Sequence, residues 1–140
     1  MDTPKVLDAL NEALVMERRS VIQFTVASGS VFGLQAQALT EKLWEFAHAE
    51  LLDLRRLVEK VTALGGDPST EQLPLEWSSD PETTVQHLIE TEEEVVAALH
   101  AVIPHSGQQP DSEALEHLME HLIMRKQNQV DWLRRAIRTP

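Results

Sequence analysis

The sequence predicts an all-α protein, a four-helix bundle in which one connection is longer than the other two. Apolar residues recur every three to four positions through four long segments, which is the spacing of core-facing helices. Glycine and proline gather between these segments. With 42% hydrophobic and 25% charged residues, the 140-residue chain has a globular composition and suits one domain over residues 1–140.

The first two helices have clear start and stop signals. The first is expected from about Pro4 to Gly29, with Thr3 as its N-cap and proline in its first turn. The second is expected from about Gln37 to Leu64, ending at the Gly65-Gly66 pair. The core-facing stripes are Leu7, Leu10, Leu14, Glu17, Val21 and Phe24 in the first helix, and Leu43, Ala47, Glu50, Leu54, Leu57, Val61 and Leu64 in the second.

The third and fourth helices are marked in the same way. The third is expected to start after Asp80-Pro81 and to end before Pro104. The fourth is expected from about Asp111 to Arg138. Their stripes are Val85, Leu88, Glu92, Val95, Leu99 and Val102 in the third helix, and Leu115, Met119, Leu122, Lys126, Gln129, Leu133 and Ala136 in the fourth.

The connections predict the topology. Ser30–Gln35 and Pro104–Pro110 are short, so the helices that they join are antiparallel neighbours. The segment Gly66–Asp80 reaches up to about 50 Å when extended, and the second helix spans roughly 40 Å. This segment can therefore cross the whole bundle, with Trp77 expected to fix it to the helices.

Polar residues interrupt all four apolar stripes near the middle of each helix. They are Glu17, Glu50 with Asp53 one turn away, Glu92, and Lys126 with Gln129. Burying an unpaired charge is costly, so a fold keeps several together when they neutralise one another, bind a metal or perform chemistry. This layer is the candidate functional site.

Composition excludes several function classes. The formal net charge is −11, with no basic stripe and few aromatic residues, which argues against nucleic acid as a partner. Without cysteine there are no disulfides or thiolate metal sites. No apolar run is long enough to span a membrane and the first residues do not resemble a secretory signal, so a cytoplasmic protein is expected.

At these residues the chain resembles the bacterioferritin and ferritin-like superfamily, over nearly its whole length. The stretch LNEALVMERRSVIQF is similar to the family's first helix, with Glu17 at the ligand glutamate, and HAELLDLRRLVEKVTALGGDP to its second, with Glu50 at the bridging glutamate. ETEEEVVAALHAVI places Glu92 at the third-helix glutamate, and VDWL places Lys126 and Gln129 at the second Glu-x-x-His pair. The resemblance implies a ferritin-like bundle with a diiron-carboxylate site and a homodimer.

The chain departs from the family at the site itself. Asp53 stands where the family has histidine, and Lys126 and Gln129 replace a glutamate and a histidine. Leu51 replaces the methionine that holds the interface haem, so no haem is expected. The family's storage cage uses a fifth helix, and this sequence stops at Pro140.

Four carboxylates, one ammonium and one amide leave the layer with a formal charge of −3. An oxygen-rich site suits Fe²⁺, Mn²⁺, Mg²⁺ or Ca²⁺. One hypothesis is at most one iron or other divalent cation held by Glu17, Glu50 and Asp53, with weak ferrous oxidation. Lys126 would then replace the second metal by pairing with Glu92 or Glu50. The alternative is a metal-free relic, a structural or protein-interaction bundle in which Lys126 bridges the carboxylates.

Two further motifs resemble metal sites. Glu45-x-x-His48 has the diiron spelling, but its helical phase places it on a solvated face with Arg55 and Glu59. His117-x-x-Glu120-His121 has the order of an inverted zinc-hydrolase motif. No third ligand is evident there, so a polar helix flank is the favoured interpretation and a zinc hydrolase the third-ranked function.

Overall fold

The computed structural model describes residues 1–140 and contains four long helices. They are α1 (Thr3–Ser30), α2 (Gln37–Ala63), α3 (Pro81–His100) and α4 (Pro110–Ile137). Two short 3₁₀ turns, η1 (Leu34–Ala36) and η2 (Ile103–His105), lie in the two short connections. The predicted all-α class and the four helical segments are confirmed.

The helix starts follow local capping. Asp80 accepts a 2.9 Å hydrogen bond from the backbone N–H of Thr83 and caps α3 as predicted. At α1 the cap is Asp2, whose carboxylate accepts from the Lys5 N–H, and not Thr3, which is already helical. Aspartate is at least as good an N-cap as threonine, so the helix gains one residue at its start.

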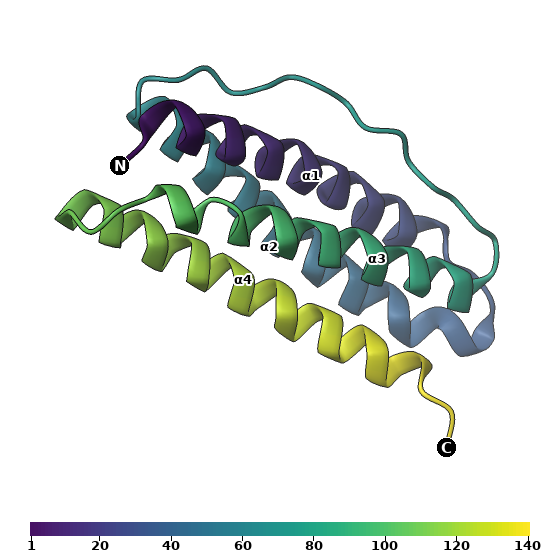
Figure 1. Cartoon of the computed structure of the whole chain (residues 1–140). Coiled ribbons are helices and arrows are strands. Elements are labelled where there is room, and N and C mark those ends of the chain that lie inside the picture. Colours follow the sequence, from purple (N-terminus) through teal and green to yellow (C-terminus); the bar gives the residue numbers. More distant parts are fainter.

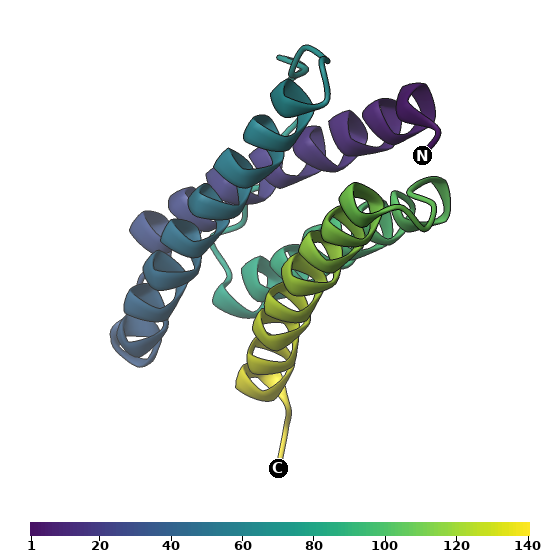
Figure 2. The same cartoon turned by 90° about the vertical axis from the view of Figure 1, so that its left-hand side faces the viewer.

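The helices form two antiparallel hairpins, α1–α2 and α3–α4, which Figure 2 separates. The segment between α2 and α3 runs the length of the bundle beside α1 (Figure 1). This is the predicted long crossover. None of the helices is long and apolar enough to cross a membrane.

Side chains of α1 fix the crossover in place. Asn11 exchanges hydrogen bonds with the backbone at Asp67 and Ser69, and the Arg18 guanidinium donates to the carbonyls of Ser69 and Glu71. Further along, Trp77 Nε1 donates to the Ser30 hydroxyl at 3.2 Å, as expected for a residue that fixes the crossover. The extended backbone thereby finds partners without forming a helix or strand.

The apolar core is divided into two clusters. One surrounds Leu10, Leu57, Leu99 and Leu115 near the chain's first residue, and the other surrounds Phe24, Leu43, Leu88 and Leu133 at the opposite end. The residues between them along each helix are the polar ones predicted from sequence. The polar layer therefore lies in the middle of the bundle, closed at both ends by apolar packing.

Candidate functional site

All four helices contribute to the polar layer. Each predicted member is 0–5% exposed, so the helical phases inferred from the stripes are correct at these positions. The members are Glu17 on α1, Glu50 and Asp53 on α2, Glu92 on α3, and Lys126 and Gln129 on α4.

The Lys126 ammonium lies at the centre of the layer. Its Nζ donates to Glu17 Oε1 at 2.8 Å, to Glu50 Oε2 at 2.7 Å and to Asp53 Oδ2 at 2.9 Å. These three bonds use all three protons of the ammonium. The predicted pairing with Glu50 is present, whereas Glu92 makes no ion pair with Lys126.

Asp53 is held by two further cations that sequence reasoning missed. Arg56 and Arg125 each donate to its Oδ1 at 2.8 Å. Arg56 lies one turn beyond Asp53 on α2, a spacing visible in the sequence, but the approach of Arg125 from α4 depends on how the helices pack. Both oxygens of Asp53 are therefore already occupied.

Gln129 joins the remaining carboxyl groups. With its amide oriented to satisfy its neighbours, its nitrogen donates to Glu50 Oε1 at 2.5 Å and to Glu92 Oε2 at 2.8 Å. Both oxygens of Glu50 are then used, one by Lys126 and one by Gln129.

Two carboxyl oxygens remain without a partner. They are Glu17 Oε2 and Glu92 Oε1, both on fully buried side chains, and the Ser20 hydroxyl is also buried and unpartnered. Buried polar atoms normally have a hydrogen-bond partner, so these oxygens mark where the layer can accept a proton or a small cation.

Burial dominates the ionisation of the glutamates. Loss of solvent, followed by the charge of Glu92, raises the pKa of Glu50 to about 8 against the opposing effect of Lys126. Burial likewise raises the pKa of Glu92 to about 7, although Lys126 opposes the shift. Burial and the charge of Glu50 place the pKa of Glu17 well above its usual range.

The other two members remain charged. Burial would raise the pKa of Asp53, but Lys126 and Arg125 outweigh it, so its pKa lies below the ordinary value. Burial would lower the pKa of Lys126, but the surrounding carboxylates hold it well above its ordinary value. Lys126 and Asp53 therefore form a charged pair, and the raised pKa values allow the glutamates to hold protons at mildly acidic pH.

This donor set does not fit two metal ions. An ammonium occupies the point on which Glu17, Glu50 and Asp53 converge, and Asp53 has no free oxygen. No group of three or more His, Cys, Asp or Glu side chains is arranged to hold a metal ion. A two-metal reaction at this centre is therefore not supported by its geometry.

The two other motifs lie outside the core. Glu45 and His48 are exposed on α2, as their helical phase predicts. His117 and His121 lie together on the exposed side of α4, also as predicted. Neither pair joins the polar layer.

The fold is shared with several solved structures. A ferritin-like diiron-carboxylate protein from Bacillus anthracis superposes with a TM-score of 0.91 at 22% identity, covering 99% of each chain. A DPS protein from Vibrio cholerae superposes with a TM-score of 0.87 at 18% identity, covering 98% of this chain and 91% of that one. Rhodobacter capsulatus bacterioferritin, with a metal-free dinuclear site, gives 0.83 at 22% identity, covering 96% and 84%.

Identities below 25% establish the shared bundle and not a shared activity. No match was found among curated proteins. The family model described as the ferritin-like domain matches residues 7–139, nearly the whole chain. Together with the four helices, the long crossover and the central polar layer, this match shows that the chain belongs to the ferritin-like domain family.

Proposed function

We propose that this chain is a ferritin-like bundle in which the Lys126 ammonium replaces the metal charge at the centre, and that it acts as a structural or protein-interaction module. The observation that carries the proposal is the position of Nζ, within 2.9 Å of carboxyl oxygens from Glu17, Glu50 and Asp53. A lysine in this position neutralises the converging carboxylates, as a bound cation would.

The charge balance supports this proposal. Lys126 pairs with the ionised Asp53, while the raised pKa values leave the glutamates largely protonated at mildly acidic pH. A carboxyl group that holds a proton carries no charge into the core. The layer is therefore neutralised by its own residues and protons.

The outer surface of α2 supports the interaction role. Trp44, Leu51 and Leu52 are 50–56% exposed along this helix. A second copy of the chain is the partner that we propose for it, giving the homodimer that the family resemblance implies.

A second candidate function is binding of one divalent cation, such as Fe²⁺ or Mn²⁺, with weak ferrous oxidation. The unpartnered oxygens of Glu17 and Glu92 favour it, because both are buried and Glu50 lies between them in the hydrogen-bonded layer. Lys126 would close the other half of the site. The chemistry that iron supplies is electron transfer to oxygen, and ionised carboxylates favour the ferric product.

Metal content separates the two candidates. Untagged protein, purified without chelator, is loaded anaerobically with ferrous iron, desalted and measured by mass spectrometry, with Glu50→Ala as the matched control. The ammonium-centred proposal expects the parent to retain no more iron than the control. One ion per chain that is lost in Glu50→Ala supports the single-cation function, and two ions contradict both.

A gain-of-function variant tests the same reasoning from the other side. Asp53→His, Lys126→Glu and Gln129→His together restore the residue types that the family resemblance gives for these positions. We expect this folded triple variant to bind two ferrous ions per chain. A triple variant that folds but binds none would mean that the loss of these ligands is not what prevents two-metal binding.

A further inference from the structure

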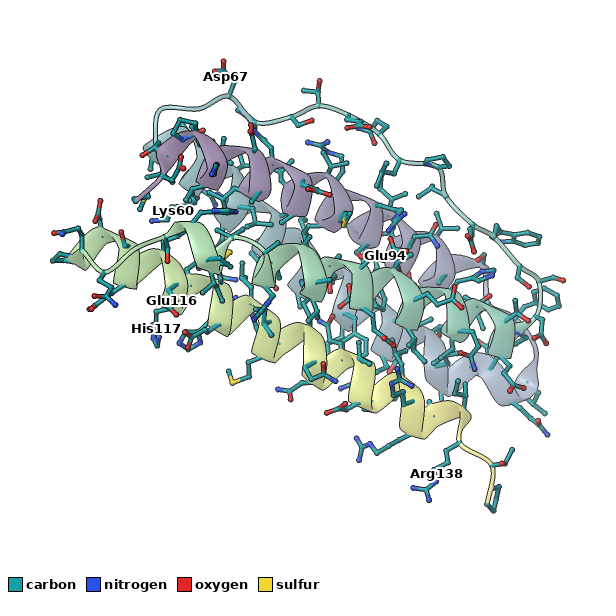
Figure 3. All side chains as sticks on the ribbon, viewed as in Figure 1. Lys60, Asp67, Glu94, Glu116, His117 and Arg138 are labelled. Carbon is teal, nitrogen blue, oxygen red and sulfur yellow. The ribbon has the colours of Figure 1, made fainter.

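Two histidine side chains on the outer surface of α4 are not explained by the function proposed above. His117 and His121 are one helical turn apart, and both are exposed. Their Nε2 atoms are 3.0 Å apart, and their ring planes are nearly perpendicular, at 89°. Figure 3 shows His117 projecting from α4 away from the other helices.

We propose that His117 and His121 form a surface chelate for a late first-row divalent cation, with Cu²⁺ and Ni²⁺ as the best-fitting ions. The two Nε2 atoms already lie 3.0 Å apart, within the span that one cation can bridge. In the metal-free state one ring donates its N–H to the other. Binding requires the donor ring to carry its proton on Nδ1 instead of Nε2, so that both Nε2 lone pairs are free for the cation and no net proton is released.

The nitrogen separation favours particular ions. With Nε2–metal distances of about 2.05 Å, two nitrogens 3.0 Å apart subtend an angle of about 94° at the metal. This is close to the right angle between neighbouring ligands in the tetragonal sites of Cu²⁺ and Ni²⁺. A tetrahedral Zn²⁺ site needs the nitrogens about 3.3–3.4 Å apart, so zinc requires the rings to separate.

The local charge favours cations. Glu113, Glu116 and Glu120 lie on the same stretch of α4, and none of them forms an ion pair. The nearest cationic residue along the helix toward its C-terminus is Arg125, whose guanidinium is bound to Asp53. The whole chain also carries a net charge of −11, which raises the local concentration of divalent cations.

The site is a two-ligand chelate and not a hydrolase centre. No third His, Cys, Asp or Glu side chain completes it. The remaining coordination positions are therefore filled by water. This separates the inference from the inverted zinc-hydrolase motif, which requires a third protein ligand to hold a catalytic metal.

Calorimetric titration of the protein with Ni²⁺ and with Cu²⁺ tests the proposal. We expect one site per chain, and roughly tenfold or greater loss of affinity in His117→Asn and in His121→Asn, because even an outer-sphere change at a metal site costs about 10–100-fold. His48→Asn, at an exposed histidine on α2, is the matched control and should bind like the parent.

Electron paramagnetic resonance of the Cu²⁺ complex gives an independent signature. We expect a tetragonal spectrum with coupling to two nitrogens, reduced to one in either single variant. Unchanged affinity in His117→Asn and His121→Asn, or a spectrum without two coupled nitrogens, would overturn the inference. Glu50→Ala should leave this site unchanged, so its outcome is distinct from that of the central layer.

Discussion

At the scale of single residues, the molecule depends on a fully buried lysine. Lys126 has no exposed surface, yet each of its three ammonium protons is accepted by a carboxyl group from another helix. A buried charge with a full set of partners is tolerated, whereas one left without partners costs several kcal/mol. Removing Lys126 is therefore the most informative single substitution.

We expect Lys126→Met to destabilise the fold by about 3–5 kcal/mol at pH 8. Methionine matches the length and fills the space, but it leaves Glu17 and Glu50 without a compensating charge, whereas Asp53 keeps Arg56 and Arg125. The loss should be clearly smaller at pH 5, because the glutamates can then be protonated in the folded state. Urea unfolding at both pH values measures the difference.

Lys5→Met is the matched control, because its side chain is 67% exposed and should matter little at either pH. An equal loss at pH 5 and pH 8 in Lys126→Met would show that packing, and not charge compensation, explains the role of Lys126. Rescue of this variant by Mn²⁺ at pH 8 would show that a cation can replace the ammonium.

The glutamates predict an unusual pH dependence for the parent protein. Burial raises the pKa of Glu50 to about 8 and of Glu92 to about 7, from ordinary values near 4.5. In that interval the folded state binds more protons than the unfolded state, so stability falls as pH rises. The lowered pKa of Asp53 has the opposite effect on stability, but the stability that it contributes is lost only when the pH falls below the ordinary aspartate pKa of 3.8.

We therefore expect stability to be greatest near pH 5 and to fall toward pH 8, by on the order of 1 kcal/mol per pH unit for each titrating glutamate. The free energy of unfolding, measured in urea at half-unit steps, gives the slope. Glu92→Gln should flatten it. Stability that increases from pH 5 to pH 8 would be incompatible with protonated glutamates in the core.

The membership of the polar layer could be predicted from sequence, but its bonding could not. Glu17 and Glu92 stand in apolar stripes, so helical periodicity alone places them inside. The bonding depends on how the helices are rotated and how far apart they lie. These two quantities decide that Lys126 contacts Glu17 and not Glu92, and that Arg125 reaches Asp53. Shifts of an ångström or so decide these contacts, and periodicity does not carry that detail.

At the scale of elements, the positions of proline and glycine predicted the first and last residues of the helices to within a few residues. Pro81 and Pro110 fit only the first turn of a helix, and Gly65 adopts φ +85° just beyond α2. The 3₁₀ turns η1 and η2 were not predicted, because they follow from how the short connections close. The path of the crossover was predicted from reach, but its anchors on α1 were not.

The crossover gives a prediction at this scale. Arg18 makes two of the hydrogen bonds that hold the crossover on α1, to the carbonyls of Ser69 and Glu71. We expect Arg18→Ala to cost about 1–3 kcal/mol, because hydrogen bonds to a charged group are worth more than neutral ones. Amide hydrogen exchange should accelerate across residues 67–77 and not within α2.

Arg55→Ala is the control for Arg18→Ala. Its side chain is 79% exposed and pairs only with Glu59 one turn away, so it should leave exchange in the crossover unchanged. Gln23 also holds the crossover, because its side-chain oxygen accepts a 3.0 Å hydrogen bond from the Glu76 backbone N–H. Unaltered exchange at residues 67–77 in Arg18→Ala would show that Asn11 and Gln23 suffice to hold the segment.

At the scale of the whole molecule, the core has an unusual division. Two apolar clusters, one at each end, enclose the polar layer from water. Water exclusion strengthens the Lys126 ion pairs and raises the glutamate pKa values, so the same enclosure produces both effects. The Lys126 ion pairs and the raised glutamate pKa values therefore both depend on the intact bundle.

The outer surface of α2 supports the last prediction, a dimer with a second copy of the chain. Trp44, Leu51 and Leu52 lie along one side of α2, followed on that side by the Arg55–Glu59 ion pair. In a two-fold arrangement with antiparallel α2 helices, the apolar residues of both copies meet, and opposite charges flank them.

We expect a dimer in sedimentation equilibrium that Leu51→Arg converts to monomer, because a charge at the centre of an apolar contact loses its solvation. Met124→Arg, 52% exposed on α4, is the control and should remain dimeric. A parent that is monomeric at high micromolar concentration would contradict the dimer, and a Leu51→Arg variant that still dimerises would place the contact on another surface.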